Sequence, residues 1–343
     1  MSKRILITGG AGFIGSNFIR YLFNRYEDYQ IIVMDALTYA GSLYNFSPEL
    51  IGDPRFSFWH GDVCNSALVL DLVNRVDVVI HFAAETHVAR SIHDDRKFFE
   101  TDVLGTQSVA NAVLRNKDRI ERFIHISSSE VYGTALTVPM TEQHPLNPLS
   151  PYAAAKAGAD RLVYSYVHTY DIPAIILRPF NQFGPYQHLE KVIPRFITSA
   201  ILDEQLTVHG RGEAKRDWLY VEDTCEYIDT VLHSDIDQVR GEVFNLGSGF
   251  DKSVVYIART ILKIMNKPES LLFFMEERPA QVLHHISSTD KAARILGIKS
   301  GRKFEEGLEE TIRWYSDNRR WWEKSLAMRC VAIMTGNGAQ QYY

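Results

Sequence analysis

The chain has 343 residues, of which 45% are hydrophobic and 23% are charged, a balance typical of a globular protein and unlike that of fibrous or disordered chains. Lysine and arginine total 37 against 42 aspartates and glutamates, for a formal charge of −5, so no basic surplus drives binding to nucleic acid. Three cysteines without CxxC spacing argue against a disulfide framework or a zinc site. We therefore expect a cytoplasmic protein without bound metal, and its strand-length apolar runs predict no membrane span or signal peptide.

Taken in chain order, the first predicted strand is Ile5–Thr8, followed by two glycines and a helix whose apolar face begins at Phe13. Further short apolar runs predict strands at 31–34, 56–58, 76–82, 123–126 and 175–177. Helical stretches lie between them, notably 66–74, 97–115 and 152–169. This alternation predicts βαβ crossovers and hence an α/β fold with a doubly wound parallel sheet of the Rossmann type.

The rhythm changes after about residue 180, where proline and glycine interrupt shorter elements. We expect a dinucleotide-binding domain over 1–180 and a smaller C-terminal α/β lobe over 181–330 that binds substrate, with some of the chain crossing back. Residues 304–321 predict a closing amphipathic helix, and 331–343 a flexible tail.

A glycine-rich turn follows the first predicted strand directly and opens the first predicted helix. Gly9, Gly12 and Gly15 are spaced as GxxGxxG, which lets the turn tighten and lets a pyrophosphate approach backbone N–H groups at the positive end of the helix. Asp35 ends the second predicted strand, where a carboxylate accepts hydrogen bonds from a ribose diol. Ala36 and Leu37 follow it and offer no cation to a 2′-phosphate. The pattern predicts a dinucleotide site that favours NAD over NADP.

Tyr152 and Lys156 lie one helical turn apart on the same face of a predicted helix. The lysine charge is expected to favour the phenolate and so to lower the tyrosine pKa, which suits a base that takes a proton from a sugar hydroxyl. By itself this YxxxK spacing often occurs by chance. Here it follows Ser128, which lies just after the predicted strand 123–126, and the three residues together form a far more specific pattern.

Over residues 4–325 the chain resembles the extended short-chain dehydrogenase/reductases that act on nucleotide sugars. Within that family it is most similar to the dTDP-glucose 4,6-dehydratases. The segments that carry the resemblance are DALTYAGSL at 35–43, HFAAETHVARS at 81–91, SPYAAAKAGAD at 150–160, GPYQHLEKVIPRFI at 184–197, RDWLYVED at 216–223 and GEVFNLGSG at 241–249.

The resemblance implies two sets of binding residues. For the dinucleotide these are Gly9, Gly12, Phe13, Ile14, Gly15, Asp35, Asp62, Val63, Ala83, Ala84, Tyr152 and Lys156. For the nucleotide-diphosphate sugar they are His87, Asn181, Lys191, Arg216, Asn245 and Arg278. An arginine suits a diphosphate because it binds phosphate oxygens in a bidentate fashion, although a structural ion pair explains either arginine equally well.

The resemblance also implies catalytic roles for Ser128, Ser129 and Glu130, beside Tyr152 and Lys156. In the dehydratases a Thr-Asp-Glu segment stands there, whose glutamate removes the C5 proton and whose aspartic acid protonates the departing C6 hydroxyl. This chain keeps the base as Glu130 but has Ser129 in place of the acid, and a hydroxyl is too weak an acid to replace a carboxylic acid directly.

Another departure stands beside the cofactor wall. The family carries an Asn-Val-x-Gly-Thr run, and this chain has Asp102 in place of the asparagine, in the run Asp-Val-Leu-Gly-Thr over 102–106.

All alternatives share a first step, in which Tyr152 removes the C4 hydroxyl proton while NAD takes the C4 hydride and Ser128 holds the oxygen. The main hypothesis is a 4,6-dehydratase, in which Glu130 then removes the C5 proton, passes it to the leaving C6 hydroxyl, and water is lost. Because of Ser129, a C4 or C5 epimerase or a UDP-glucuronate decarboxylase-like enzyme is the alternative. A non-catalytic NAD-binding sensor is the alternative of another class. The resemblance further implies a homodimer paired through the helices 97–115 and 152–169.

Overall fold

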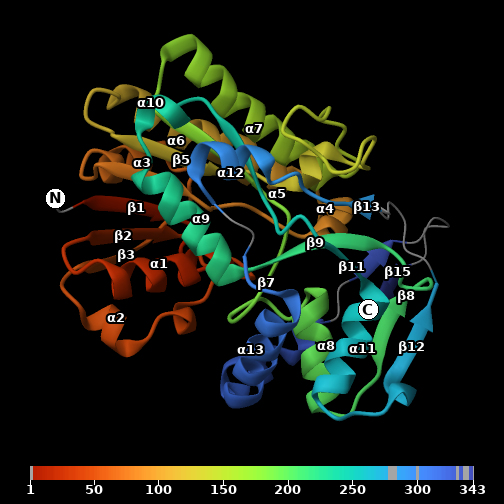
Figure 1. Ribbon diagram of the computed structural model, residues 1–343. Coiled ribbons are helices and arrows are strands. Elements are labelled where there is room, and N and C mark those ends of the chain that lie inside the picture. Colours follow the sequence, from red (N-terminus) through yellow and green to blue (C-terminus); the bar gives the residue numbers. More distant parts are fainter. Residues whose placement is uncertain (1–2, 277–283, 299–300, 330–331, 335–339, 343) are drawn as a thin grey trace.

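The computed structural model describes residues 3–276, 284–298, 301–329, 332–334 and 340–342. A seven-stranded parallel sheet with the order β10-β6-β5-β4-β1-β2-β3 forms the centre of the larger lobe (Figure 1). Its strands are β1 (Arg4–Thr8), β2 (Gln30–Asp35), β3 (Phe56–His60), β4 (Val78–His81), β5 (Arg122–Ile126), β6 (Ala174–Pro179) and β10 (Val243–Leu246). The strand order reverses between β1 and β4, the point at which open α/β sheets bind ligands. The predicted doubly wound parallel sheet is confirmed.

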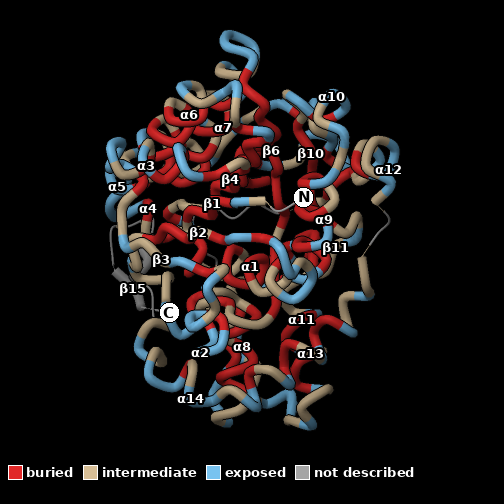
Figure 2. Tube along the Cα trace, turned by 90° about the vertical axis from the view of Figure 1, so that its left-hand side faces the viewer, coloured by how far each residue is buried: buried red, intermediate tan, exposed pale blue. Residues whose placement is uncertain are grey.

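Helices cover both faces of this sheet. Those on one face are α3 (Ser66–Val73), α6 (Thr106–Arg115) and α7 (Pro151–Tyr170), and those on the other are α1 (Phe13–Arg25), α9 (Val221–His233) and α12 (Asp290–Leu296). Successive side chains of a strand point to opposite faces, so Ile5 and Ile7 of β1 share one core with Phe18 of α1, whereas Leu6 shares the other with Val109 of α6. Buried chain accordingly runs through the middle of the lobe in Figure 2.

The smaller lobe packs α8 (Val192–Ile201), α11 (Val254–Ile264) and α13 (Phe304–Asp317) around a core that includes Phe196, Ile257 and Tyr315. In one small sheet, β9 (Lys215–Tyr220) pairs with β7 (Asn181–Phe183), β11 (Asp251–Ser253) and β13 (His284–His285). In another, β8 (Leu206–His209) pairs with β12 (Leu272–Met275). The predicted C-terminal lobe with mixed helices and strands is therefore present.

Short helical elements connect these parts. They are α2 (Pro48–Gly52), α4 (Val88–His93), α5 (Arg96–Phe98), α10 (Ile236–Val239), α14 (Arg319–Trp322), η1 (Leu43–Asn45), η3 (Ser129–Tyr132), η4 (Glu269–Leu271) and η5 (Glu323–Arg329). The predicted helix 304–321 is interrupted at Asn318, between α13 and α14. Within the stretch expected to form a tail, β14 (Ala332–Met334) pairs antiparallel with β15 (Gln340–Tyr342).

The predicted helix 97–115 is helical throughout but changes geometry within its length. Between α5 and α6 lies a π-helical segment, η2 (Phe99–Gly105). Such segments are rare and often stand at functional sites. Here the segment includes Asp102, whose side chain is fully buried, although hydrophobic periodicity alone predicts a regular α-helix.

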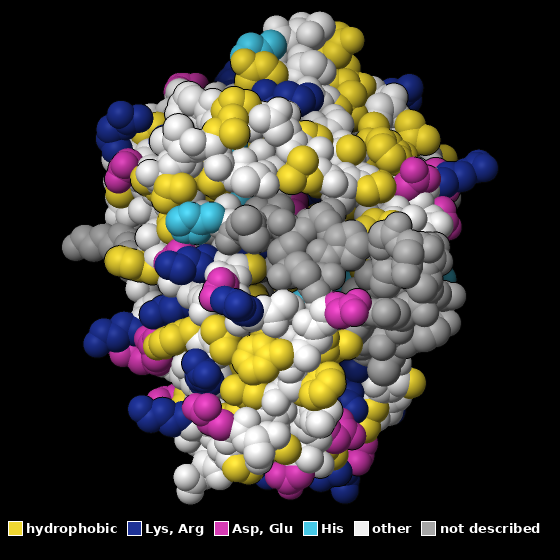
Figure 3. Space-filling view, turned by 90° about the vertical axis from the view of Figure 1, so that its right-hand side faces the viewer, with side chains coloured by type: hydrophobic (Ala, Val, Ile, Leu, Met, Phe, Trp, Pro, Cys, Tyr) yellow, Lys and Arg dark blue, Asp and Glu magenta, His cyan; other side chains and the backbone are white. Residues whose placement is uncertain are grey.

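The described surface carries both signs of charge. On the face in Figure 3, acidic and basic side chains are interspersed among polar and apolar ones. Among the described helices, none combines the length and the apolarity needed to cross a bilayer.

A buried ion pair joins α7 to β6. Arg178 donates to both carboxylate oxygens of Asp160, at 2.8 and 2.9 Å, and its side chain is 2% exposed. The Ser127 hydroxyl donates to the same carboxylate at 2.7 Å, and Arg178 also donates to the Tyr132 hydroxyl at 2.9 Å. The pair therefore fixes the segment that follows β5 against α7.

We expect Asp160→Asn to lower the free energy of unfolding by about 3 to 5 kcal/mol, because it leaves the Arg178 guanidinium buried without its counter-charge. Chemical denaturation measures this loss. The matched control is Asp171→Asn, which breaks the exposed pair with Arg240 (3.1 Å, Asp171 side chain 74% exposed) and should change stability by less than about 1 kcal/mol. Equal losses in the two variants would contradict the anchoring role.

Candidate functional site

A cleft of about 790 Å³ lies between the two lobes, at the carboxyl ends of β1, β4 and β5. Every residue that the sequence predicted for dinucleotide binding lines it. Of the residues predicted for catalysis, Ser128, Glu130, Tyr152 and Lys156 also line it, whereas Ser129 does not and is 2% exposed. The cleft thus brings together residues from the first 160 positions and from the smaller lobe.

The glycine turn between β1 and α1 has the form that a phosphate-binding turn requires. Gly9 has a positive φ of 69°, and a Cβ there would lie 2.5 Å from the backbone nitrogen of Ala83. A Cβ at Gly15 would lie 2.6 Å from the Gly9 carbonyl oxygen. At Gly12, the N-cap of α1, a Cβ would meet only that same oxygen, at 3.3 Å. Gly9 and Gly15 therefore permit the tight turn, while Gly12 leaves room for a ligand to approach the helix N-terminus.

Asp35 stands at the end of β2 beside this turn. Its carboxylate accepts hydrogen bonds from the backbone N–H groups of Ala11 (2.9 Å) and Leu37 (2.8 Å). Burial raises the pKa of Asp35, and the two N–H groups oppose this effect. The carboxylate is thereby held at the edge of the cleft, the location that ribose binding requires.

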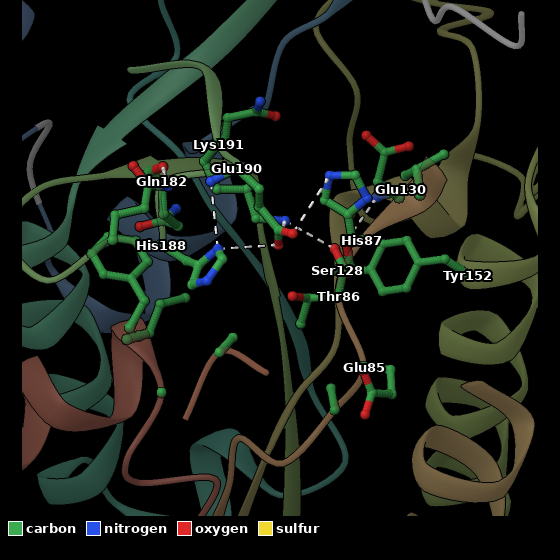
Figure 4. Close-up of a pocket in the computed structure, with 18 of the residues that line it drawn as sticks. Glu85, Thr86, His87, Ser128, Glu130, Tyr152, Gln182, His188, Glu190 and Lys191 are labelled. Carbon is green, nitrogen blue, oxygen red and sulfur yellow. Dashed lines mark hydrogen bonds and ion pairs between the residues drawn. The ribbon is translucent and has the colours of Figure 1, made fainter. Parts of the chain in front are cut away.

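The tyrosine and the lysine of the YxxxK pattern lie on the first turns of α7. The Tyr152 hydroxyl is hydrogen-bonded to Ser128, and its ring packs edge-on against Phe98 with the centroids 6.1 Å apart. The Lys156 ammonium donates to the carbonyl oxygen of Ile126 at 2.8 Å. The Ser128 hydroxyl also accepts a hydrogen bond from the Glu130 N–H at 3.2 Å and so caps the N-terminus of η3. In Figure 4, Ser128, Glu130 and Tyr152 lie together on one side of the cleft.

The electrostatics of Tyr152 differ from the expectation. Burial raises the pKa of the phenol above its usual value, the hydrogen bond with Ser128 lowers it, and the charges of Asp102 and Glu130 raise it. Burial also lowers the pKa of Lys156. The expected lowering of the Tyr152 pKa is therefore wrong for these residues taken alone, because desolvation of the phenolate outweighs the hydrogen bond with Ser128, which is the contact that lowers this pKa.

The residues predicted for the nucleotide sugar separate into three groups. His87, Asn181, Lys191 and Arg216 line the cleft. Asn245 does not, because its fully buried amide donates to the Met140 carbonyl at 2.9 Å and accepts from the Tyr132 hydroxyl at 2.7 Å. Arg278 lies outside the described residues.

Some lining residues were not predicted from the sequence. They are Glu85, Thr86, Gln182, Glu190, Arg195 and Arg329 among others. Glu85 and Thr86 follow Ala84 just beyond β4, and this position in the chain is a signal that finds them. Arg329 comes from η5, far along the chain, and no local pattern marks it.

Glu190 forms the centre of a charged group at the wall of the cleft. Its carboxylate lies 3.3 Å from Arg90, 3.7 Å from Lys191 and 3.9 Å from His87. Burial raises the pKa of Glu190, but these cations and His188 lower it more, and the net pKa lies below its usual value. Among the described residues, no group of three or more His, Cys, Asp or Glu side chains has a metal-binding arrangement.

A glycine turn at a helix N-terminus, a carboxylate ending the second strand and a Ser-Tyr-Lys set in one cleft define an extended short-chain dehydrogenase/reductase. The family model described as GDP-mannose 4,6 dehydratase matches residues 6–311. The chain belongs to this family.

Individual relatives agree with this assignment. The chain is 45% identical over 312 residues to the low-salt glycan biosynthesis protein Agl12 of Haloferax volcanii, covering 91% of this chain and 98% of the relative. It is 40% identical to a dTDP-glucose 4,6-dehydratase of Streptomyces niveus, covering 93% and 95%. Among solved structures, DesIV, a dTDP-glucose 4,6-dehydratase of Streptomyces venezuelae solved with NAD bound, is similar with a TM-score of 0.88 and 38% identity, covering 94% and 99%.

The residues of the cleft fit NAD. The room above Gly12 accommodates a pyrophosphate, and Asp35 offers a ribose diol its carboxylate. No lysine or arginine stands at positions 36 to 41, which follow Asp35, so this segment supplies no cation for a 2′-phosphate. NAD is the cofactor of this enzyme.

Proposed function

We propose that the protein is a nucleotide-sugar 4,6-dehydratase. The observation that carries this proposal is the single cleft in which a base, a hydroxyl and a carboxylate, namely Tyr152, Ser128 and Glu130, line the same space as the dinucleotide turn. Membership of the family and the dehydratases among the relatives support it. A sensor has no use for a base beside a nicotinamide, so the same observation disfavours the sensor alternative.

Each residue has a proton to hold or move. Bound NAD supplies a hydride acceptor and a positive charge beside the sugar. Tyr152 takes the proton of the C4 hydroxyl, and Ser128 holds the oxygen through the hydroxyl that it already directs at Tyr152. Once C4 is a ketone, the C5 proton is acidic because its carbanion is an enolate. Glu130, which is partly exposed to the cleft, takes that proton.

The departing C6 hydroxyl needs a proton, and Ser129 is outside the cleft. We assign this donation to the carboxyl of Glu130 after it has taken the C5 proton. In the elimination, the C5–H electrons form the C5=C6 bond, the C6–O bond breaks, and the C5 proton leaves in the water molecule. The reaction balances when the hydride taken from C4 returns to C6 and a proton from solvent is added at C5, so that the sugar loses only water. Because the same carboxyl of Glu130 both takes the C5 proton and donates it, the proton could be returned to C5 instead of to the leaving oxygen. A C5 epimerase is therefore the second candidate.

We assign the nucleotide-diphosphate sugar to the smaller-lobe side of the cleft. Lys191 at the N-terminus of α8, Arg216 on β9 and Asn181 on β7 support this assignment, because they present cations and an amide to one space. His87, the N-cap residue of α4, lines the same cleft from the larger lobe. We give Asn245 a structural role instead, since its amide is already hydrogen-bonded.

The enzyme should convert one member of a panel of dTDP-glucose, UDP-glucose and GDP-mannose into a product lighter by one water molecule, measured by mass spectrometry, with UDP-glucuronate added to detect decarboxylation. The Tyr152→Phe variant, which lacks the base, should turn over the same substrate at least about a hundredfold more slowly. Unchanged masses with altered NMR couplings would instead identify an epimerase. A loss of carbon dioxide would identify a decarboxylase.

Glu130→Gln should abolish exchange of solvent deuterium into C5 while leaving reduction of NAD measurable by absorbance, because only the second step uses this carboxylate. The matched control is Glu213→Gln, an exposed carboxylate on the same cleft, which should retain exchange. Retained exchange in the Glu130 variant would remove this residue from its role.

We also propose that two copies pair through η2, α6 and α7. Phe99 and Leu104 on η2 are 42% and 57% exposed, and Tyr164 on α7 is 37% exposed, which leaves apolar area on the two adjacent helices. Leu104→Glu should shift the molar mass measured by light scattering from dimer to monomer. Leu136→Glu, at a leucine that is 67% exposed elsewhere, should leave it unchanged. A wild-type protein that is monomeric at micromolar concentration rules the proposal out.

A further inference from the structure

Asp102 is a buried carboxylate that the reaction described above does not use. It lies in the π-helical segment η2 and has no exposed surface. Its Oδ1 accepts a hydrogen bond from the Glu85 N–H at 2.8 Å, while its Oδ2 is buried and has no hydrogen-bond partner among the described residues. The related dehydratases are expected to carry asparagine here, which has an N–H group in place of one oxygen. Aspartate therefore adds a buried titratable group that contacts Glu85, a residue lining the cleft.

The groups that face Asp102 belong to the catalytic side of the cleft. Charges on Lys156 and Glu85 act on it, and its own charge acts on Tyr152 and Lys156 of α7. Other charged groups of the same helix are engaged elsewhere: Arg96 lies 2.7 Å from Glu100, and Lys97 lies 3.9 Å from Asp62. Asp102 thus stands closest in electrostatic terms to the base and its lysine.

An ionised carboxylate in this place lacks most of the hydrogen bonds that it had in water. One carboxylate oxygen accepts a hydrogen bond from a backbone N–H, and the other has no hydrogen-bond partner among the described residues. Burial therefore strongly disfavours the charged form. Burial raises the pKa of Asp102 to about 7, although the charge of Lys156 and the Glu85 N–H lower it. The group is consequently able to gain or lose a proton in the range in which most enzymes work.

We propose that Asp102 is a positioning residue that carries a proton while Tyr152 takes the proton of the sugar hydroxyl, and that loss of the Asp102 proton makes Tyr152 a less available base. This inference rests on the proposed function. The direction follows from charge, because an ionised Asp102 disfavours a phenolate at Tyr152 and favours the charged form of Lys156. Asparagine at this position has no such state.

The kinetic test compares the rate of NAD reduction in wild type and Asp102→Asn as a function of pH, under single-turnover conditions with the substrate found above. The two rates should be in a constant ratio at acid pH, and the variant should gain on wild type as pH rises through neutrality, by about tenfold for each unit change in the pKa of Tyr152. Glu100→Gln, on the same segment but ion-paired at the surface, should follow wild type. A ratio that does not change with pH overturns the proposal.

A second measurement needs no substrate. In protein labelled with carbon-13 at the aspartate carboxyls and saturated with NAD, one resonance should titrate near neutral pH and be missing from Asp102→Asn, or from Asp102→Ser if the first variant does not fold. A resonance assigned to Asp102 that titrates below about pH 5, as an ordinary aspartate does, overturns the proposal. If this resonance behaves as expected but no panel sugar reacts, the proposed function fails while the titration of Asp102 stands.

Stability gives an independent check on the sign. The folded protein holds a proton on Asp102 at pH values where the unfolded chain has lost it, so this group favours the folded state at acid pH and loses that contribution as pH rises toward its folded pKa. The free energy of unfolding of wild type, relative to that of Asp102→Asn, should therefore fall between about pH 4 and pH 7. A difference that is flat or rises over this range contradicts a protonated Asp102.

Discussion

The ion pair between Asp160 and Arg178 is the interaction on which the catalytic end of the cleft depends. It joins α7, which carries Tyr152 and Lys156, to β6, and the Ser127 hydroxyl attaches the segment after β5 to the same carboxylate. Removing two charges from water is expensive, and only a bidentate geometry with further hydrogen bonds offsets that penalty. Together with the Ser127 hydroxyl, the pair fixes the distance between α7 and the segment after β5, which are not neighbours in the chain. That distance determines how closely the Tyr152 phenol on α7 approaches the Ser128 hydroxyl.

The parts of the site that the sequence predicted are those whose chemistry is local. The glycine turn and Asp35 are recognisable because the turn, the helix start and the strand end follow each other within a short stretch, and each residue acts through its own backbone position. The alternation of strands and helices predicted the sheet for the same reason. Glu190 and Arg329 reach the cleft only through tertiary packing, and no spacing rule connects them with the motifs at 9–15 or 150–160.

Two misjudged features have a common physical origin. The π-helical turn at 99–105 keeps the hydrophobic face of a helix, so its periodicity does not reveal it. The pKa of Tyr152 rises because the ring is buried against Phe98, and a sequence shows which charges are near in the chain but not how much water has been removed. In both cases the pattern of residue types indicated the correct element or motif, but it did not indicate the local backbone geometry or the extent of burial. Asp102 combines the two, since the turn buries it and the burial changes its proton affinity.

The path of the chain between the lobes limits how this enzyme can be divided. β10 lies at the edge of the large sheet and pairs with β6, from Val243 against Ile176 to Leu246 against Pro179, although more than sixty residues separate them and most of these build the smaller lobe. A protein fragment that stops near residue 180 would keep the pairing of β6 with β5 but would leave the N–H and C=O groups that face β10 unpaired, and such an exposed edge strand promotes aggregation. A chimaera that takes its smaller lobe from a relative as one continuous segment must therefore also contain a strand that pairs with β6 as β10 does.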